Sequence, residues 1–182
     1  ETVPAGNGRP PGLVKGTLKG TGQLRVLLIA HMDTVYRQGI LKSEPYHRDG
    51  NRLYGPGIAD DKGGIATILA SLDILHAAGW KNYAELTVLF DPDEEISSPG
   101  SGKIIAAMAA HQDVVLSYEP SPAKDVAKME GVLLGAAGTG SITLTVHGRA
   151  AHAGAAPEQG RNALLELAYQ LQQTRDIASG VP

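Results

Sequence analysis

The chain has 182 residues, of which 42% are hydrophobic and 19% are charged, and its formal net charge is −3 at pH 7. These values are typical of one folded globular domain, or of one domain and part of another, and they exclude a disordered chain. The spread of charge excludes a basic surface for nucleic acid, and the absence of cysteine excludes disulfides, thiolate metal ligands and a cysteine nucleophile.

The first predicted elements are two strands. Residues 13–18 alternate between apolar and polar side chains, and a Thr-Gly turn then leads into an apolar run over residues 24–30. This run predicts a strand buried on both faces, and it ends in a His-x-Asp motif, His31 and Asp33. An extended backbone would point both side chains the same way, so that Asp33 could accept the second imidazole N–H. On this stretch alone, a surface histidine beside a turn aspartate is the alternative.

A loop with paired aspartates follows a predicted hairpin. The hairpin is expected over residues 43–54, with Asp-Gly at positions 49–50. The loop over residues 54–64 contains two glycines and a proline before Asp60 and Asp61. A phosphate-binding loop is the alternative, but the Gly-Lys-Ser/Thr ending is missing and two aspartates would repel phosphate.

Helices and strands alternate in the middle of the chain. Apolar residues at helical spacing predict helices over residues 65–78 and 101–111, and short apolar runs predict strands over residues 86–90 and 114–118. This order predicts an α/β fold with a mostly parallel sheet flanked by helices.

Each of the three apolar strands runs into a residue that can bind a metal ion. His31 follows the first strand, Glu94 and Glu95 follow the second, and Glu119 follows the third. Because the carboxyl ends of parallel strands share one edge of a sheet, we expect these side chains to converge, together with Asp60. Solvated loop acids are the alternative, and the repetition over three strands argues against it.

Nitrogen and carboxylate ligands without sulfur suit zinc in a catalytic site, or cobalt or manganese. Three carboxylates and a hydroxide carry four negative charges, which two divalent ions would balance. Such a site lowers the pKa of a bound water towards about 7 and polarises a carbonyl oxygen, as amide hydrolysis requires. Glu94, next to a ligand but on the other side of the backbone, is the expected general base.

The character of the sequence changes at a linker that contains proline and lysine, residues 121–130. Beyond it, a strand is predicted over residues 141–147 and a helix over residues 162–174, with His152 in a loop of small residues between them. One strand and one helix cannot close a core, so these elements would be the start of a second domain. We expect a catalytic metal-binding domain over residues 1–134 and the start of a smaller α+β domain over residues 135–182.

Five motifs together resemble those of a known family. In chain order they are His-Met-Asp-Thr-Val at 31–35, Gly-Ile-Ala-Asp-Asp-Lys-Gly-Gly at 57–64, Asp-Glu-Glu at 93–95, Glu-Pro at 119–120 and Gly-Arg-Ala-Ala-His-Ala-Gly at 148–154. This series resembles the dizinc aminoacylase and carboxypeptidase metallopeptidases, and among them the glutamate carboxypeptidases of the carboxypeptidase G type. The resemblance implies a zinc exopeptidase-like catalytic domain followed by a lid and dimerisation domain.

The resemblance also implies how two zinc ions would be held. His31 and Glu119 would hold one ion, Glu95 would help to hold the other, and Asp60 would bridge the two. The peptide bond between Asp60 and Asp61 would be cis, which is rare outside proline.

Three further residues receive catalytic roles from the resemblance. Asp33 would orient His31, and Glu94 would be the general base. His152, in the lid domain, would reach the substrate of the partner subunit and stabilise the oxyanion, which implies a homodimer formed through the lid.

The implied activity is the zinc-dependent removal of a C-terminal amino acid, glutamate in particular, from peptidyl or N-acyl, folate-like substrates with a free C-terminal carboxylate. The alternatives are an N-acyl amino acid deacylase or desuccinylase of the same family, and a non-catalytic metal-binding fragment. Relatives continue beyond both ends of the matching part, where they supply a last histidine ligand and an arginine for the substrate carboxylate, so this chain is expected to be incomplete.

Two kinds of partner are not expected. No apolar run approaches the roughly 18 residues of a membrane span, and the N-terminus has no features of a signal peptide. We therefore expect a soluble protein, cytoplasmic or periplasmic, without membrane or nucleic-acid partners.

Overall fold

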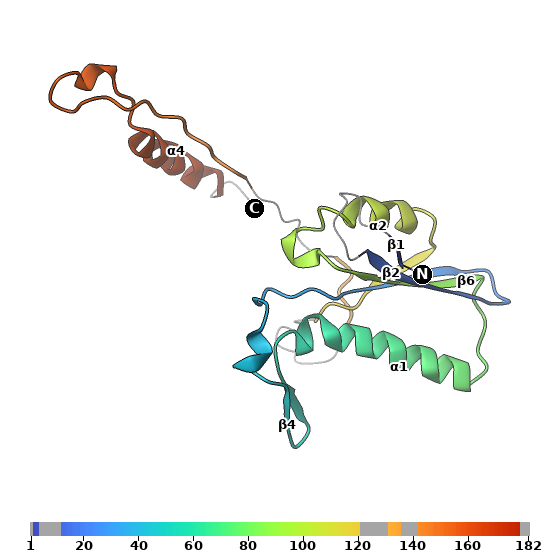
Figure 1. The fold of residues 1–182 in the computed structure, drawn as a ribbon. Coiled ribbons are helices and arrows are strands. Elements are labelled where there is room, and N and C mark those ends of the chain that lie inside the picture. The colour runs from blue at the N-terminus through green and yellow to red at the C-terminus, as the bar shows by residue number, and fades with distance from the viewer. Residues whose placement is uncertain (1, 4–11, 121–130, 136–141, 179–182) are drawn as a thin grey trace. The chain divides into compact units, whose positions relative to one another are not determined.

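The chain divides into two compact units, Glu1–Leu133 and Leu134–Pro182 (Figure 1). The computed structural model describes residues 2–3, 12–120, 131–135 and 142–178. The predicted linker over residues 121–130 lies outside the described residues.

A five-stranded sheet forms the centre of the first unit. Strand β3 is parallel to β6 and to β7, whereas β2 is antiparallel to β6 and β1 is antiparallel to β2. The predicted α/β fold is confirmed, and the sheet is mixed. The turn that joins β2 to β3 is much shorter than the dozen or so residues that a parallel crossover needs, so β2 runs antiparallel to its neighbour β6. The spatial order of the strands is β1 (Thr2–Val3), β2 (Leu13–Lys19), β6 (Glu85–Asp91), β3 (Arg25–His31) and β7 (Val114–Ser117).

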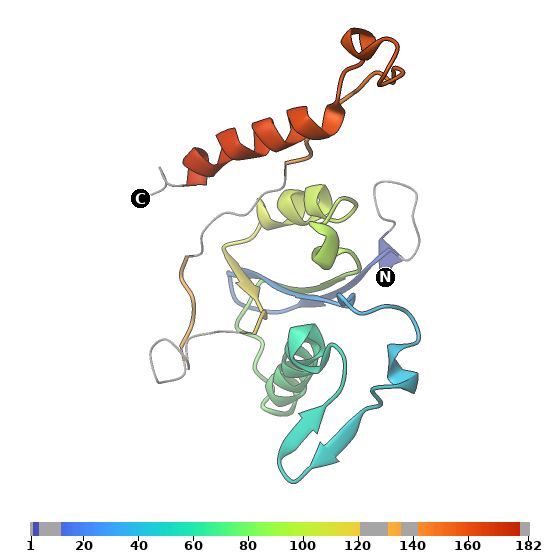
Figure 2. The same ribbon diagram turned by 90° about the vertical axis from the view of Figure 1, so that its left-hand side faces the viewer.

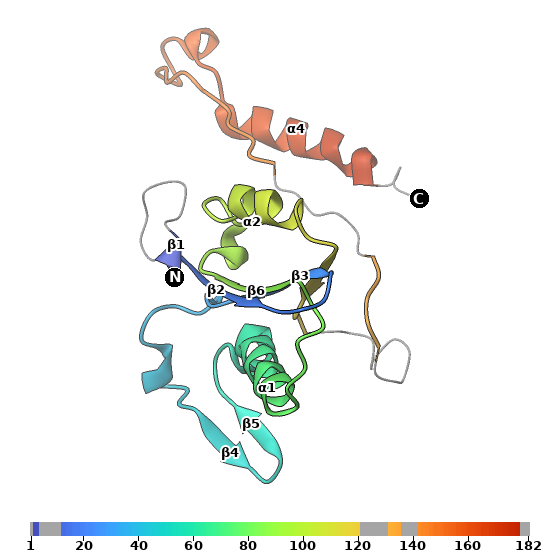
Figure 3. The same cartoon turned by 90° about the vertical axis from the view of Figure 1, so that its right-hand side faces the viewer.

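Two helices cover opposite faces of this sheet (Figure 3). Helix α1 (Gly64–Ala77) packs on the face where Leu28 of β3 is buried together with Ile68 of the helix. Helix α2 (Gly102–Ala109) packs on the other face, against the core that contains Leu27. Successive residues of β3 therefore enter different cores, which explains why its sequence is continuously apolar.

Leu27 gives a direct test of this core, because its side chain is 0% exposed. We expect Leu27→Ala to lower the free energy of unfolding by about 2–5 kcal/mol, through lost burial and the cavity left behind. Urea denaturation measures the change. Leu41→Ala is the matched control, because Leu41 is 59% exposed and its loss should alter stability by about 0.5 kcal/mol or less. Equal effects of the two substitutions would contradict this packing.

The predicted hairpin is confirmed and consists of β4 (His47–Asp49) and β5 (Arg52–Tyr54). Gly50 in its turn has φ +55°, a left-handed conformation that glycine adopts without strain. The hairpin lies on the same side of the sheet as α1, whereas α2 lies on the other side (Figure 2). A short 3-10 turn, η1 (Ile40–Lys42), precedes it.

The second unit contains helix α4 (Ala163–Ala178), which confirms the predicted helix. Asn162 precedes the helix, and its side-chain oxygen accepts the backbone N–H groups of Leu164 and Leu165. A 3-10 turn, η4, spans Pro157–Gln159. The predicted strand over residues 141–147 is wrong for the described residues 142–147, which have no strand pairing. Alternation alone does not make a strand without a neighbour, and the described part of this unit offers a single bridge, between Arg149 and Arg161.

Among the described residues, no helix combines the length and the apolar character needed to cross a membrane.

Candidate metal centre

The parallel strands end at one edge of the sheet and carry the predicted site residues with them. His31 is the last residue of β3, Glu119 follows β7, and the 3-10 turn η3 (Glu94–Ile96) follows β6. Asp60 lies in η2 (Ile58–Gly63), the distorted turn that leads directly into α1. The structure thus brings together residues from four segments that are far apart in the sequence.

His31 lies at the centre of the cluster and is 1% exposed. Its Nε2 is 2.9 Å from Oδ1 of Asp60 and 3.7 Å from Oε1 of Glu119. Its Nδ1 is 3.2 Å from the backbone carbonyl oxygen of Asp33 and 3.3 Å from the Oδ1 of that residue. The structure therefore places Asp33 beside the imidazole as the spacing predicts, and the hydrogen bond runs to its backbone carbonyl.

The carboxylate of Asp33 also makes contacts that the sequence did not suggest. Its Oδ1 accepts the backbone N–H of Glu94 at 3.2 Å, and its Oδ2 accepts that of Glu95 at 3.0 Å. Asp33 therefore ties the end of β3 to η3, which carries one proposed ligand and the proposed base.

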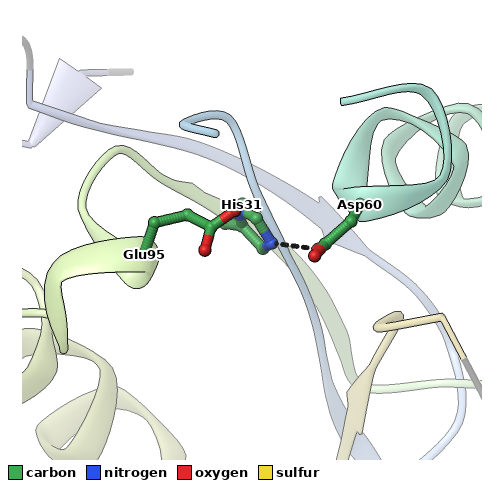
Figure 4. Close-up of side chains that lie close together, drawn as sticks. All are labelled: His31, Asp60 and Glu95. Carbon is green, nitrogen blue, oxygen red and sulfur yellow. Dashed lines mark hydrogen bonds and ion pairs between the residues drawn. The ribbon is translucent and has the colours of Figure 1, made fainter. Parts of the chain in front are cut away.

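The paired aspartates of η2 have different surroundings. The peptide bond between them is cis, which confirms the expectation from the resemblance. The side chain of Asp60 is 54% exposed and faces His31, whereas Asp61 is 0% exposed. Figure 4 shows Asp60 and Glu95 pointing towards His31 from opposite sides.

Two groups of side chains are close enough to share a metal ion. One ligand atom from each of His31, Asp60 and Glu95 lies within 4.8 Å of the others, and the same holds for His31, Asp61 and Glu119. The donors are one imidazole and several carboxylates, a set that suits a divalent ion such as zinc.

The charges at this edge are poorly balanced by the protein alone. Partial burial and the carboxylates of Asp61, Glu94 and Asp60 raise the pKa of Glu119 to about 7, against the opposing effect of His31. Burial lowers the pKa of His31, but the hydrogen bond to Asp60 and the nearby carboxylates outweigh it and raise this pKa to about 9. The site therefore favours bound protons or other cations, which fits a metal centre.

Two further aspartates lie just before η3, and neither was assigned a role from the sequence, although Asp93 belongs to the Asp-Glu-Glu motif. Asp93 accepts the backbone N–H groups of Gly100 at 2.6 Å and Ser101 at 3.3 Å, and also the Ser101 hydroxyl. Asp91 is 3% exposed, and burial raises its pKa to about 6. For Asp91, its position just before the predicted base and ligand is the signal in the sequence; for Asp93, the Asp-Glu-Glu motif is a second one.

His152 lies in the second unit, where its side chain is exposed. Its Nδ1 accepts the backbone N–H groups of Gly154 at 3.2 Å and Ala155 at 3.1 Å. With Nδ1 as acceptor, the neutral imidazole carries its proton on Nε2, which can donate a hydrogen bond.

The histidine and carboxylate cluster at the carboxyl edge of this flanked α/β sheet offers ligands of the kind that a metal-dependent hydrolase uses. A family model described as peptidase family M20/M25/M40 matches residues 27–181. The chain therefore belongs to this peptidase family.

Individual relatives agree with this assignment. Carboxypeptidase G2 of Pseudomonas sp. (strain RS-16) is 46% identical over 164 residues, which cover 90% of this chain and 39% of that protein. Acetylornithine deacetylase of Edwardsiella ictaluri (strain 93-146) is 33% identical over 150 residues, which cover 80% of this chain and 36% of that protein. The chain thus spans less than two fifths of the length of either relative.

A solved structure shows the same fold. The crystal structure of an M20 family metallo-carboxypeptidase from Sulfolobus solfataricus superposes with a TM-score of 0.52 and 19% sequence identity. The match covers 65% of this chain and 28% of that one.

Proposed function

We propose that this chain carries the metal centre of a zinc-dependent hydrolase that removes a C-terminal amino acid, glutamate in particular, from peptidyl or N-acyl substrates. The observation that carries the proposal is the convergence of His31 with Asp60, Glu95 and Glu119 at one edge of the sheet. The 46% identity to carboxypeptidase G2 supports the choice of a carboxypeptidase.

The donor set fits two zinc ions, or cobalt or manganese in their place. His31 and Glu119 would hold one ion, Glu95 would contribute to the second, and Asp60, which faces His31 at 2.9 Å, would bridge them. When bound, the ions would supply an activated water and polarise the carbonyl of the substrate.

The residues around the metals would handle the protons. Glu94 would take a proton from the attacking water and pass it to the leaving nitrogen, and burial already raises its pKa in the direction that favours this exchange. Asp33 would keep Glu94 in place through the backbone N–H of that residue, at 3.2 Å. His152 would donate from Nε2 to the developing oxyanion of a substrate held by the partner subunit.

In this proposal the first unit would carry the catalytic role, and the second would be the lid and dimerisation domain. A homodimer formed through the lid, and a substrate with a free C-terminal carboxylate, complete the proposal. The substrate need not be a peptide, since an amide bond to any acyl group would present the same carbonyl.

An N-acyl amino acid deacylase is a second candidate function. The 33% identity to acetylornithine deacetylase favours it, because that relative matches 80% of this chain. The two activities differ in the product that is released, so a panel of N-acyl glutamates, glutamyl peptides and N-acetylated amino acids distinguishes them.

The decisive experiment combines elemental mass spectrometry of the purified 182-residue protein with an assay for released glutamate, with and without a chelator. About two zinc ions per chain, with glutamate release that the chelator abolishes, would support the proposal and would mean that another group replaces the last histidine ligand that the resemblance implies. Zinc without hydrolysis of any substrate would favour the non-catalytic metal-binding alternative. The absence of both zinc and hydrolysis would overturn the proposal.

A further inference from the structure

Asp61 is a buried acid that the proposed mechanism does not use. Its side chain is 0% exposed, yet both carboxylate oxygens have partners in different elements. Oδ2 accepts the backbone N–H of His31, the last residue of β3, at 3.2 Å. Oδ1 accepts the backbone N–H of Gly64, the first residue of α1, at 3.1 Å. Asp61 therefore joins the end of a strand to the start of a helix.

These hydrogen bonds lie next to two of the proposed ligands. One is made by His31 itself, and the other is made by Gly64, at the end of the turn that carries Asp60. His31 offers its side chain to the cluster and its backbone N–H to Asp61. Asp60 is the residue immediately before Asp61, so holding Asp61 also limits where Asp60 can move. The Gly64 N–H is one of the first four of helix α1 and therefore has no partner within that helix. It donates to Oδ1 and to the backbone carbonyl of Asp61, so Asp61 supplies both of its acceptors.

The surroundings of Asp61 leave little room for adjustment. A methyl group added at Gly64 would lie 2.2 Å from Oδ1 of Asp61 and 2.5 Å from the carbonyl oxygen of Tyr118. Tyr118 directly precedes Glu119, so the segment that carries this third proposed ligand is packed against the same point. The glycine at position 64 permits this close approach.

We propose that Asp61 is a positioning residue of the metal centre, which fixes the separation of His31 and Asp60 through its two backbone hydrogen bonds. One of its oxygens lies within 4.8 Å of ligand atoms of His31 and Glu119. Both oxygens accept backbone N–H groups from the elements that carry the proposed ligands, and the role that we assign to Asp61 is to support these ligands. The inference rests on the proposed metal site, and it adds a residue to which neither the sequence nor the resemblance assigned a role.

The test is Asp61→Asn, which keeps the size of the side chain but turns an amide NH₂ towards one of the two N–H donors. Co²⁺ is titrated into the metal-free proteins, and the affinity and the visible absorption spectrum are recorded. We expect an affinity about 10–100-fold below that of the unsubstituted protein, the usual effect of losing a residue that orients a ligand. We also expect the absorption bands to shift, because the geometry around the ion changes.

Leu27→Ala is the control for a general loss of stability, because Leu27 is buried in the core beneath α2 and not among the ligands. It should retain the affinity and the spectrum of the unsubstituted protein, with folding checked by circular dichroism. If Asp61→Asn does not fold, Gly64→Ala provides the second variant, since its methyl group would displace the same carboxylate.

The outcomes separate the two proposals. Unchanged affinity and an unchanged spectrum in folded Asp61→Asn, or in Gly64→Ala, would overturn the positioning role alone. Failure of the unsubstituted protein to bind Co²⁺ would overturn both the positioning role and the proposed metal centre.

Discussion

Replacing Glu94 by glutamine is expected to lower the rate of glutamate release by about 10²–10⁴-fold while the protein keeps its metal ions. Glutamine has the shape of glutamate but cannot accept the proton of the attacking water. The backbone N–H of Glu94 would still be held by Asp33, so the change is confined to the side-chain group. Initial rates at saturating substrate, with zinc measured on the same samples, give the result.

Two matched substitutions make this experiment specific. Glu95→Gln, at the neighbouring residue of the same turn, should lose metal as well as activity, because Glu95 is a proposed ligand. Glu44→Gln, on an exposed segment, should change neither. Near-normal turnover in Glu94→Gln would show that this carboxylate is not the base, even where the metal content supports the rest of the site.

Asp60→Asn is expected to reduce the metal content from about two ions per chain towards none. A bridging carboxylate contributes to both ions, and Asp60 is also the partner of His31 Nε2 at 2.9 Å. The loss of affinity should exceed the roughly 10–100-fold that removal of an orienting residue causes. Equilibrium dialysis against zinc, followed by elemental analysis, measures it.

Asp49→Asn is the control for this substitution, because Asp49 is an exposed aspartate of the β4–β5 hairpin. It should bind zinc as the unsubstituted protein does. Retention of two ions by Asp60→Asn would argue against a bridging role and would leave His31, Glu95 and Glu119 to hold the metals by other means.

The elements of the first unit could be predicted because each has a local signal. The continuous apolar run before His31 reflects burial on both faces, and the spacing of apolar residues from Ile65 to Leu75 reflects the face of α1 that meets the sheet. Another local signal, the alternation of apolar and polar residues, was misleading over residues 142–147, because the described part of the chain supplies no neighbouring strand there.

The convergence of the candidate site residues at one edge of the sheet was predictable for a related reason. A strand that ends in His31 and another that ends near Glu95 must share an edge when they are parallel, and β3 and β6 are parallel. The sequence could not reveal that the carboxylate of Asp33 holds the backbone of η3, because this contact joins residues about 60 positions apart.

The sequence by itself therefore determined the α/β class, the segments that carry the proposed ligands and the family, since periodicity, composition and short motifs are local properties. The tertiary structure alone decided that Asp60 faces His31 while its identical neighbour Asp61 is buried. Two adjacent aspartates are chemically equivalent in a sequence. Only the packing of β3 against the start of α1 gives one of them two backbone N–H partners and leaves the other facing His31 as a proposed metal ligand.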